Sequence, residues 1–286
     1  MDISTLLQSI LNGFSSAGIY ILVALGLTLV LSIMNIVQLA HGEIYMIGAY
    51  GVYYITTSLG LNFFLALVIS TLLMGGLGIV LERLCFRPLR GQFDRAAIAS
   101  IGLILILQNV VLSIAGGDPR SYMSPFTGVL KILGVAISWD RLSIVLFGFG
   151  LVAALFLFIR MTKTGQAMLA ISQDRDGAAL QGINIDRISM AAMFLGCALA
   201  AIAGALVGAI FSVSPTMGGF ALMKGIAVII LGGLGSIPGA VVGGLIIGLI
   251  DGIMPILTTT HIAGLIGFGA IIIILLFRPQ GISGHE

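Results

Sequence analysis

Four polar side chains lie close together in a part of the sequence that is otherwise free of charge. They are Asn35, Gln38, His41 and Glu43. If the flanking apolar segments cross a bilayer, a charge at its centre costs about 2.5–3.5 kcal/mol on insertion scales. A buried Glu43 would then need a function, or a partner such as His41. Two interpretations stay open: a hydrated loop at a membrane surface, or a discontinuous helix whose polar groups line a path through the bundle.

A second motif is the glycine-rich run at residues 232–244, which reads GGLGSIPGAVVGG. The four-residue spacing of Gly235, Gly239 and Gly243 is typical of helices in close contact. The alternative is a helix break that forms a gate or binding element, because Pro238 cannot continue a helix. The motif is not a phosphate-binding loop, since no Gly-Lys-Ser/Thr follows it or occurs elsewhere in the chain.

The longest polar stretch is residues 160–187, 28 residues that favour a helix between Gly165 and Gly182. An ordinary connection has roughly 2–8 residues. One interpretation is an amphipathic helix resting on the membrane. The other, which its mixed charge favours over a polybasic lipid-binding segment, is a helix that docks a soluble partner.

The composition decides what surrounds these motifs. Of the 286 residues, 59% are hydrophobic and 8% are charged, whereas a soluble domain carries roughly 25% charged residues. A soluble enzyme, a nucleic-acid-binding protein and a disordered chain are therefore excluded, and lipid is the expected surrounding. The 40 glycines indicate tightly packed helices, some of them interrupted. Two scattered cysteines and three dispersed histidines form neither a disulfide framework nor a metal cluster.

Eight apolar segments follow one another along the chain. They are residues 5–33, 44–57, 61–81, 96–115, 142–159, 188–211, 225–250 and 262–277. One spanning helix needs about 20 residues. We therefore expect an all-α polytopic membrane protein of about eight transmembrane or partly spanning helices, with interrupted or re-entrant elements, in one domain over residues 1–286. Residues 212–224 are expected to be a loop and residues 251–261 a short connection.

The basic residues predict the orientation. Loops 82–95 and 160–187 each hold four Lys or Arg, whereas loop 116–141 holds three in 26 residues. By the positive-inside rule the first two loops are cytoplasmic and the third is external. The C-terminal tail from Arg278 is expected to be cytoplasmic as well, so only two full crossings, 188–211 and 262–277, fit between Arg187 and Arg278. Segment 225–250 must then enter and return as two half-helices that meet near Pro238, inside the bundle. Whether segment 44–57 crosses or re-enters decides on which side the N-terminus lies, and the sequence leaves this open.

Three motifs in the same order resemble one family. Residues 12–50, with Ala24-Leu-Gly-Leu-Thr-Leu29 and Ala40-His-Gly-Glu43, resemble the membrane permeases of branched-chain amino-acid ABC importers of the LivH type. The run from Gly165 to Gly182 is similar to the cytoplasmic coupling loop of that family. Residues 232–244 are similar to its late glycine-rich motif. The resemblance extends over essentially the whole chain.

The resemblance implies a transport subunit of the bacterial inner membrane that works with partners. It implies a second homologous permease, two cytoplasmic ATPase subunits that bind the ATP, and a periplasmic solute-binding protein. No catalytic residue, metal, cofactor of its own or nucleic-acid partner is expected. The residues expected to couple to the ATPase are Gly165, Ala170, Asp174, Ala178 and Gly182. Those expected in the translocation path or gate are Asn35, Gln38, His41, Glu43, Gly235, Ser236, Pro238 and Gly239.

The exact substrate stays open. Leucine, isoleucine and valine are what the resemblance implies, and related permeases serve urea or short amides. A rival from another class is a secondary transporter or channel driven by an ion gradient, with Glu43 or Asp251 as its titrating carboxylate.

Overall fold

The computed structural model describes residues 3–126, 128–132, 135–258, 260–278 and 280–283. Its longer helices are α1 (Ile3–Met34), α2 (His41–Ser58), α3 (Phe63–Leu81), α4 (Phe93–Ala115), α5 (Trp139–Met161), α8 (Ile185–Gly208), α9 (Met217–Gly232), α10 (Ile237–Leu257) and α11 (Thr260–Phe277). Its short elements are η1 (Glu82–Phe86), η2 (Arg87–Leu89), α6 (Lys163–Gln173), α7 (Arg175–Leu180) and the antiparallel hairpin β1 (Val129–Ile132) and β2 (Val135–Ser138). Within these residues six helices are long and apolar enough to cross a membrane. The predicted all-α polytopic fold is confirmed, with one small hairpin that the sequence did not indicate.

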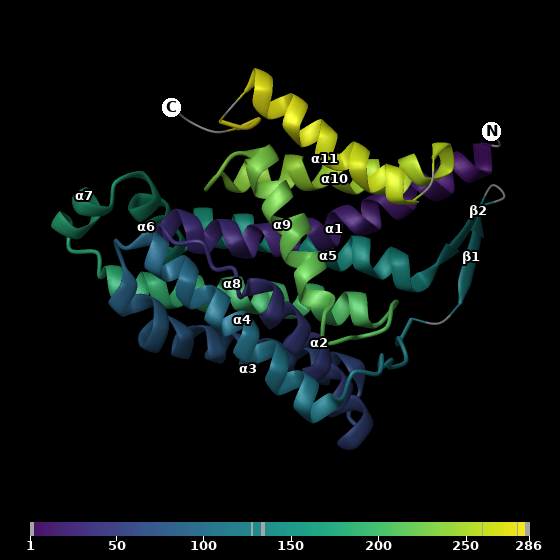
Figure 1. Cartoon of the computed structure of the whole chain (residues 1–286), viewed down its shortest axis with the longest axis horizontal. Coiled ribbons are helices and arrows are strands. Elements are labelled where there is room, and N and C mark those ends of the chain that lie inside the picture. The colour runs from purple at the N-terminus through teal and green to yellow at the C-terminus, as the bar shows by residue number, and fades with distance from the viewer. Residues whose placement is uncertain (1–2, 127, 133–134, 259, 279, 284–286) are drawn as a thin grey trace.

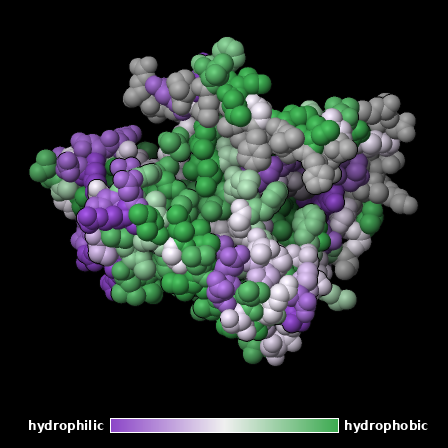
Figure 2. Space-filling view, viewed as in Figure 1, coloured by the Kyte–Doolittle hydropathy of each residue, from purple (hydrophilic) through white to green (hydrophobic). Residues whose placement is uncertain are grey.

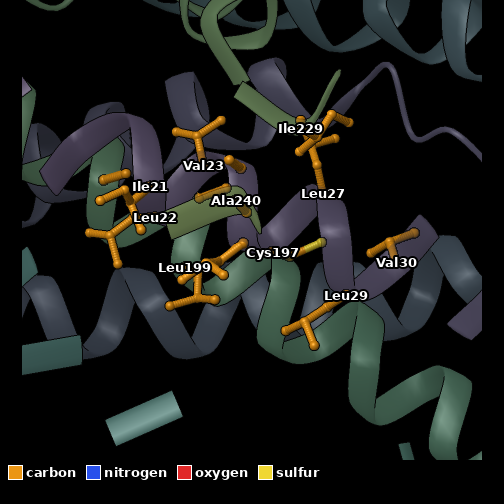
Figure 3. Packing of buried hydrophobic residues seen from close by; sticks show 14 of the residues in the cluster. Ile21, Leu22, Val23, Leu27, Leu29, Val30, Cys197, Leu199, Ile229 and Ala240 are labelled. Atoms are coloured by element: carbon orange, nitrogen blue, oxygen red, sulfur yellow. The ribbon is translucent and has the colours of Figure 1, made fainter. Parts of the chain in front are cut away.

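Helix α1 runs through the middle of the bundle and packs on α5, α8, α9 and α10 (Figure 1). It carries no charged residue between Asp2 and its end, and a helix that is apolar on all sides is buried. Ile21, Leu22 and Leu25 are fully buried on it. Figure 3 shows side chains of α1 packed with Cys197 and Leu199 of α8, Ile229 of α9 and Ala240 of α10.

Glycines set the spacing between α1 and α10. A methyl group added to Gly248 would lie 2.5 Å from Ala17 Cα, and one added to Gly244 would lie 3.3 Å from the backbone nitrogen of Ile21. Small residues let helix backbones approach closely in a membrane. Part of the high glycine content is therefore explained by this contact.

The two basic loops lie together at one end of the bundle, named here the basic end, and the hairpin lies at the far end (Figure 1). At the basic end Arg90 forms an ion pair with Asp186 of α8. At the far end Ser15 of α1 donates a hydrogen bond to the carbonyl of Arg141 of α5, at 3.3 Å. The N-terminal part of α1 thus lies at the opposite end from loop 82–95.

Helix α2 begins inside the bundle. Residues 35–40 turn the chain back from the end of α1, and they place His41 beside Gly26, where an added methyl group would lie 2.6 Å from His41 Nε2. After α2, the ring of Phe63 lies 6.1 Å from that of Tyr122 in the far-end loop. Helix α2 therefore runs from the interior to the far end. From Gln38 to Glu43 the polar side chains of the interruption are buried and do not form a hydrated surface loop, whereas Asn35 is exposed.

Helices α9 and α10 form a helical hairpin whose turn, residues 233–236, lies at the basic end (Figure 1). The chain breaks where the glycines and Pro238 predict it, since Pro238 stands in the first turn of α10. However, α10 is a full-length candidate span, not a half-helix, and the turn lies at the end of the bundle and not in its middle. Helix α9 runs obliquely across α1 (Figure 1).

Two expected connections are wrong for the same physical reason. Helix α9 begins at Met217 and contains Lys224, and α10 continues to Leu257 and contains Asp251. Each charge suggested a loop when the sequence was considered segment by segment. In the structure the two charges are paired with each other, so both helices continue through them.

The surface matches a membrane protein. Figure 2 shows hydrophobic residues over the middle of the visible face, with hydrophilic residues gathered over α6 and α7 at the basic end. Large apolar side chains stand exposed on the outer helices, among them Leu73 of α3 and Ile98 and Ile106 of α4. Lipid is the expected neighbour of such a band.

Candidate translocation and coupling sites

Three of the predicted path residues are enclosed by neighbouring helices. Gln38 Nε2 donates a hydrogen bond to Cys197 Sγ of α8 at 3.8 Å, and Gln38 Oε1 lies 3.4 Å from His41 Nδ1. Gln38, His41 and Glu43 are all buried. The turn that returns the chain to α2 thus carries its polar side chains into the bundle.

Glu43 is a buried carboxylate for which the described residues supply no ion pair. The residue is 4% exposed, and its Oε2 has no hydrogen-bond partner among the described residues. The pairing with His41 that the sequence suggests is not formed, because His41 faces Gln38. Helix α9 closes over this point, where a methyl group on Gly218 would lie 2.5 Å from the carbonyl oxygen of Gly42.

The other predicted path residues lie mostly around one cavity. A cavity of about 1210 Å³ at the basic end is bounded by the end of α1, the α9–α10 turn, α6 and residues 282–283. The predicted path residues in its lining are Asn35, Gly235, Ser236 and Pro238. Gly239 packs against Gly232 instead. The eight predicted residues therefore form an interior group and a cavity group, with Gly239 holding α9 against α10.

The predicted coupling residues lie on the α6–α7 segment, residues 163–182, which protrudes at the basic end (Figure 1). Asp174 caps the N-terminus of α7, since its Oδ1 accepts hydrogen bonds from the backbone nitrogens of Asp176 at 3.1 Å and Gly177 at 3.0 Å. Gly182 ends α7 with a φ of +82°, which favours glycine. Asp174 therefore fixes the start of α7 and Gly182 its end.

Burial separates the five coupling residues. Asp174 and Gly182 are exposed and Ala170 is half-buried, whereas Gly165 and Ala178 are buried. Gly165 lies so close to the backbone of Ile159 that a side chain would not fit. Gly165 and Ala178 consequently hold the segment against the bundle and offer no surface to a partner.

An ion-pair cluster braces the start of α8 just after the coupling segment. Arg90 bridges Glu82, at the end of α3, and Asp186, in the first turn of α8. Partial burial lowers the pKa of Arg90, and the negative charge of Glu82 opposes that shift. The forked guanidinium suits two carboxylates at once.

Two further residues escaped the sequence analysis. Leu180 is 88% exposed at the end of α7, and a leucine within the polar stretch 160–187 could have indicated it. Lys224 pairs with Asp251 inside the bundle. The pattern that could have indicated this pair is one basic and one acidic residue in two consecutive apolar stretches.

Comparison with known proteins decides the family. Residues 9–276 match the family model described as "Branched-chain amino acid transport system / permease component". The chain belongs to this family. It is 34% identical to the high-affinity branched-chain amino acid transport system permease protein LivH of Escherichia coli K12, covering 98% of this chain and 96% of LivH. It is 33% identical to BraD of Pseudomonas aeruginosa, a permease protein of the same kind of system, with the same two coverages.

A solved structure supports the fold. PsaBC from Streptococcus pneumoniae, in complex with a Fab, superposes with a TM-score of 0.51 at 13% sequence identity, covering 93% of this chain and 90% of that one. Family membership and the six apolar spans make the chain a multi-pass inner-membrane transport permease and not an enzyme. They favour the importer permease over an ion-driven secondary transporter. Asp251 fits that rival poorly, because Lys224 neutralises it.

Proposed function

We propose that this chain is the membrane permease subunit of an ATP-driven importer of branched-chain amino acids. The observation that carries the proposal is the place of the α6–α7 segment. It protrudes from the basic end, exposes Leu180 at the end of α7, and forms a wall of the cavity that holds the α9–α10 turn. A soluble partner that binds this segment can displace it, and the displacement is transmitted to the helices that line the cavity.

The proposed assembly has four kinds of component besides the lipid. A second, homologous permease completes the translocation path, two cytoplasmic ATPase subunits bind and hydrolyse ATP, and a periplasmic binding protein delivers the substrate. The basic end then faces the cytoplasm, as the positive-inside rule expects. The permease itself needs no cofactor, because ATP acts on the partners.

The coupling segment acts through its two faces. Leu180 and Asp174 are exposed and face the ATPase, whereas Met168 and Ile171 are buried toward the end of α1 and line the cavity. Movement of α6 therefore changes the cavity wall opposite the α9–α10 turn. Asn35, Gly235, Ser236 and Pro238 act as the inner gate in this proposal.

The interior group serves the path itself. Gln38, His41 and Glu43 are polar groups at the point where α2 begins inside the bundle. A buried carboxylate oxygen without a partner is costly. We infer that a transported molecule or a second conformation of the permease pair completes it.

The test is reconstitution with the partner subunits. Proteoliposomes that hold this permease with its second permease, two ATPases and binding protein are expected to take up leucine when ATP is supplied. The permease alone is expected to be inert. Uptake by the isolated chain along an ion gradient would instead support the secondary transporter, and uptake of urea or short amides but not leucine would reassign the substrate.

The docking step has its own variant and control. Leu180→Asp places a charge at the proposed contact and is expected to abolish co-purification of the ATPase subunits. Leu59→Asp is the matched control, because Leu59 is 67% exposed in the loop between α2 and α3 toward the far end. Equal loss in both variants, or none in Leu180→Asp, would show that the ATPase docks elsewhere.

A further inference from the structure

The C-terminal end of α9 is completed by a distant part of the chain. A helix leaves its last carbonyl oxygens without partners inside the helix, and α9 stops at Gly232. The backbone nitrogen of Ile282 donates a hydrogen bond to the carbonyl of Leu231 at 2.9 Å, and that of Ser283 donates to Gly232 at 2.9 Å. Residues 281–283, named here the tail segment, therefore cap α9.

This cap is unlike the others at the turn. Helix α10 is capped locally, since Ser236 Oγ accepts a hydrogen bond from the backbone nitrogen of Gly239 at 3.1 Å. Helix α9 has a local cap as well, from the backbone nitrogen of Gly233 to the carbonyl of Ile229 at 2.9 Å, but the carbonyls of Leu231 and Gly232 are capped from about fifty residues further along the chain, by the segment that follows α11. The position of the turn thus depends on the placement of α11 and of the tail segment.

Gly281 makes the contact possible. It is buried, with a φ of +79° that side chains rarely adopt, and a methyl group there would lie 2.6 Å from the backbone nitrogen of Gly233 and 2.7 Å from its Cα. Both neighbours are backbone atoms, which cannot rotate away. A side chain at this position would therefore separate the tail segment from the turn.

The tail segment also lines the cavity that the coupling segment lines. Ile282 and Ser283 line the same cavity as Met168 and Ser172 of α6 and Ser236 of the turn. One cavity wall is thus the proposed receiver of the ATPase movement and another is the proposed gate. The tail segment is bonded to the end of α9, directly before the turn that carries the gate residues.

We propose that the tail segment is a positioning element of the transport cycle: it holds the α9–α10 turn against the cavity, so that movement of α6 is converted into movement of the gate. This role rests on the proposed function, whereas the attachment of the tail segment to α9 can be tested without it. Without the attachment, ATP hydrolysis continues and transport becomes uncoupled from it.

The experiment compares two glycines that differ in their surroundings. Gly281→Ala introduces the clash, whereas Gly116→Ala changes a glycine of nearly the same φ, +77°, that has no atom within 4 Å. A chain that ends after Gln280 serves as a second variant. Hydrogen exchange of the purified permease follows the backbone amides at 231–240 and 282–283. Leucine uptake and ATP hydrolysis are measured in the full reconstituted complex.

The expected result has two parts. In Gly281→Ala and the shortened chain, the hydrogen-bonded amides of Ser236, Gly239 and Ala240 exchange about tenfold faster, as expected for local opening, and Gly116→Ala leaves them unchanged. Leucine transported per ATP hydrolysed falls about fivefold, the low end of coupling factors between sites.

Each other outcome overturns part of the inference. Unchanged exchange in both variants would show that the tail segment does not hold the turn. Faster exchange with unchanged transport per ATP would show that it caps α9 without any role in coupling. A wild-type complex that fails to transport leucine would overturn the proposed function and the coupling role with it, while the exchange comparison would still decide the attachment.

Discussion

Lys224 on α9 and Asp251 on α10 form an ion pair inside the bundle, with Nζ 2.6 Å from Oδ2 and 2.9 Å from Oδ1. Tyr20 of α1 donates a hydrogen bond to the same Oδ2 at 2.8 Å, and Lys224 Nζ lies 5.6 Å from the centre of its ring. Three helices therefore meet at one carboxylate. The pair places two charges in apolar helices without leaving either one isolated.

Replacing one partner of this ion pair is expected to destabilise the protein more than replacing both. Asp251→Asn or Lys224→Met leaves one buried charge behind, at a cost of about 3–5 kcal/mol, whereas a double apolar replacement is often neutral. We expect the single variants to lose most of the monodisperse protein in detergent. The double variant Lys224→Met with Asp251→Leu should recover it. A double variant no better than the singles would assign the pair a role other than mutual neutralisation.

Close backbone contact between α2 and α8 gives a prediction about stability. A methyl group on Gly204 would lie 2.8 Å from the carbonyl carbon of Tyr45, which cannot move aside, and overpacking of this kind costs about 1–3 kcal/mol. Gly204→Ala is expected to lower the thermal unfolding temperature in detergent. Gly150→Ala, on an exposed face of α5 with no atom within 4 Å, is the control and should leave it unchanged or slightly raised. Equal shifts in the two variants would refute the close contact.

The sequence predicted the parts of the fold that depend on local composition. The spans around 61–81, 96–115, 142–159 and 188–211 correspond to α3, α4, α5 and α8, because long apolar runs need no tertiary information. The hairpin of β1 and β2 is a local pairing that the sequence did not indicate, with Val129 opposite Ser138 and Ile132 opposite Val135. The oblique course of α9 depends on neighbours far apart in the chain. A window along the sequence does not contain those neighbours.

The candidate sites follow the same division. The motifs predicted the two sets of candidate residues. They did not predict that Asn35 and Ser236 share one cavity, nor that Ala178 is buried while Leu180 is exposed. The partnership of Lys224 with Asp251 was missed for a related reason. Within its own segment Lys224 indicates a loop, and Asp251 indicates a short connection or a titrating carboxylate, although a charge within an apolar segment also indicates a partner elsewhere.

The cluster at the basic end predicts that arginine and lysine are not interchangeable there. Arg90 reaches Glu82 with one guanidinium nitrogen and Asp186 with the other, and a lysine has no fork to bond both. Arg90→Lys is expected to lower the unfolding temperature and the transport rate, because Glu82 and Asp186 are then no longer bridged, although Arg87 still pairs with Asp186. Arg95→Lys is the control, since Arg95 is exposed and bonds only to Gln92 Oε1, at 2.7 Å, among the described residues. If both replacements behave alike, the double contact has no energetic value.

Replacement of Glu43 is expected to affect the stability of the permease and its transport activity differently. Its Oε2 is enclosed and has no hydrogen-bond partner in the described part of the chain, so this oxygen contributes no bond to the resting fold. Glu43→Gln keeps the size of the side chain and removes its charge. The unfolding temperature of the permease is expected to stay the same or to rise, since an isolated buried charge is costly.

Transport should respond in the opposite direction if Glu43 serves the path. ATP-driven leucine uptake by the complex is expected to fall about tenfold, which corresponds to about 1.4 kcal/mol of lost interaction. Glu82→Gln is the matched control, because Glu82 is equally buried but paired with Arg90. It should lower stability first, and transport only as far as folded protein is lost. Full uptake by Glu43→Gln would remove Glu43 from the path, and a loss of stability in that variant would show that the carboxylate has a structural partner after all.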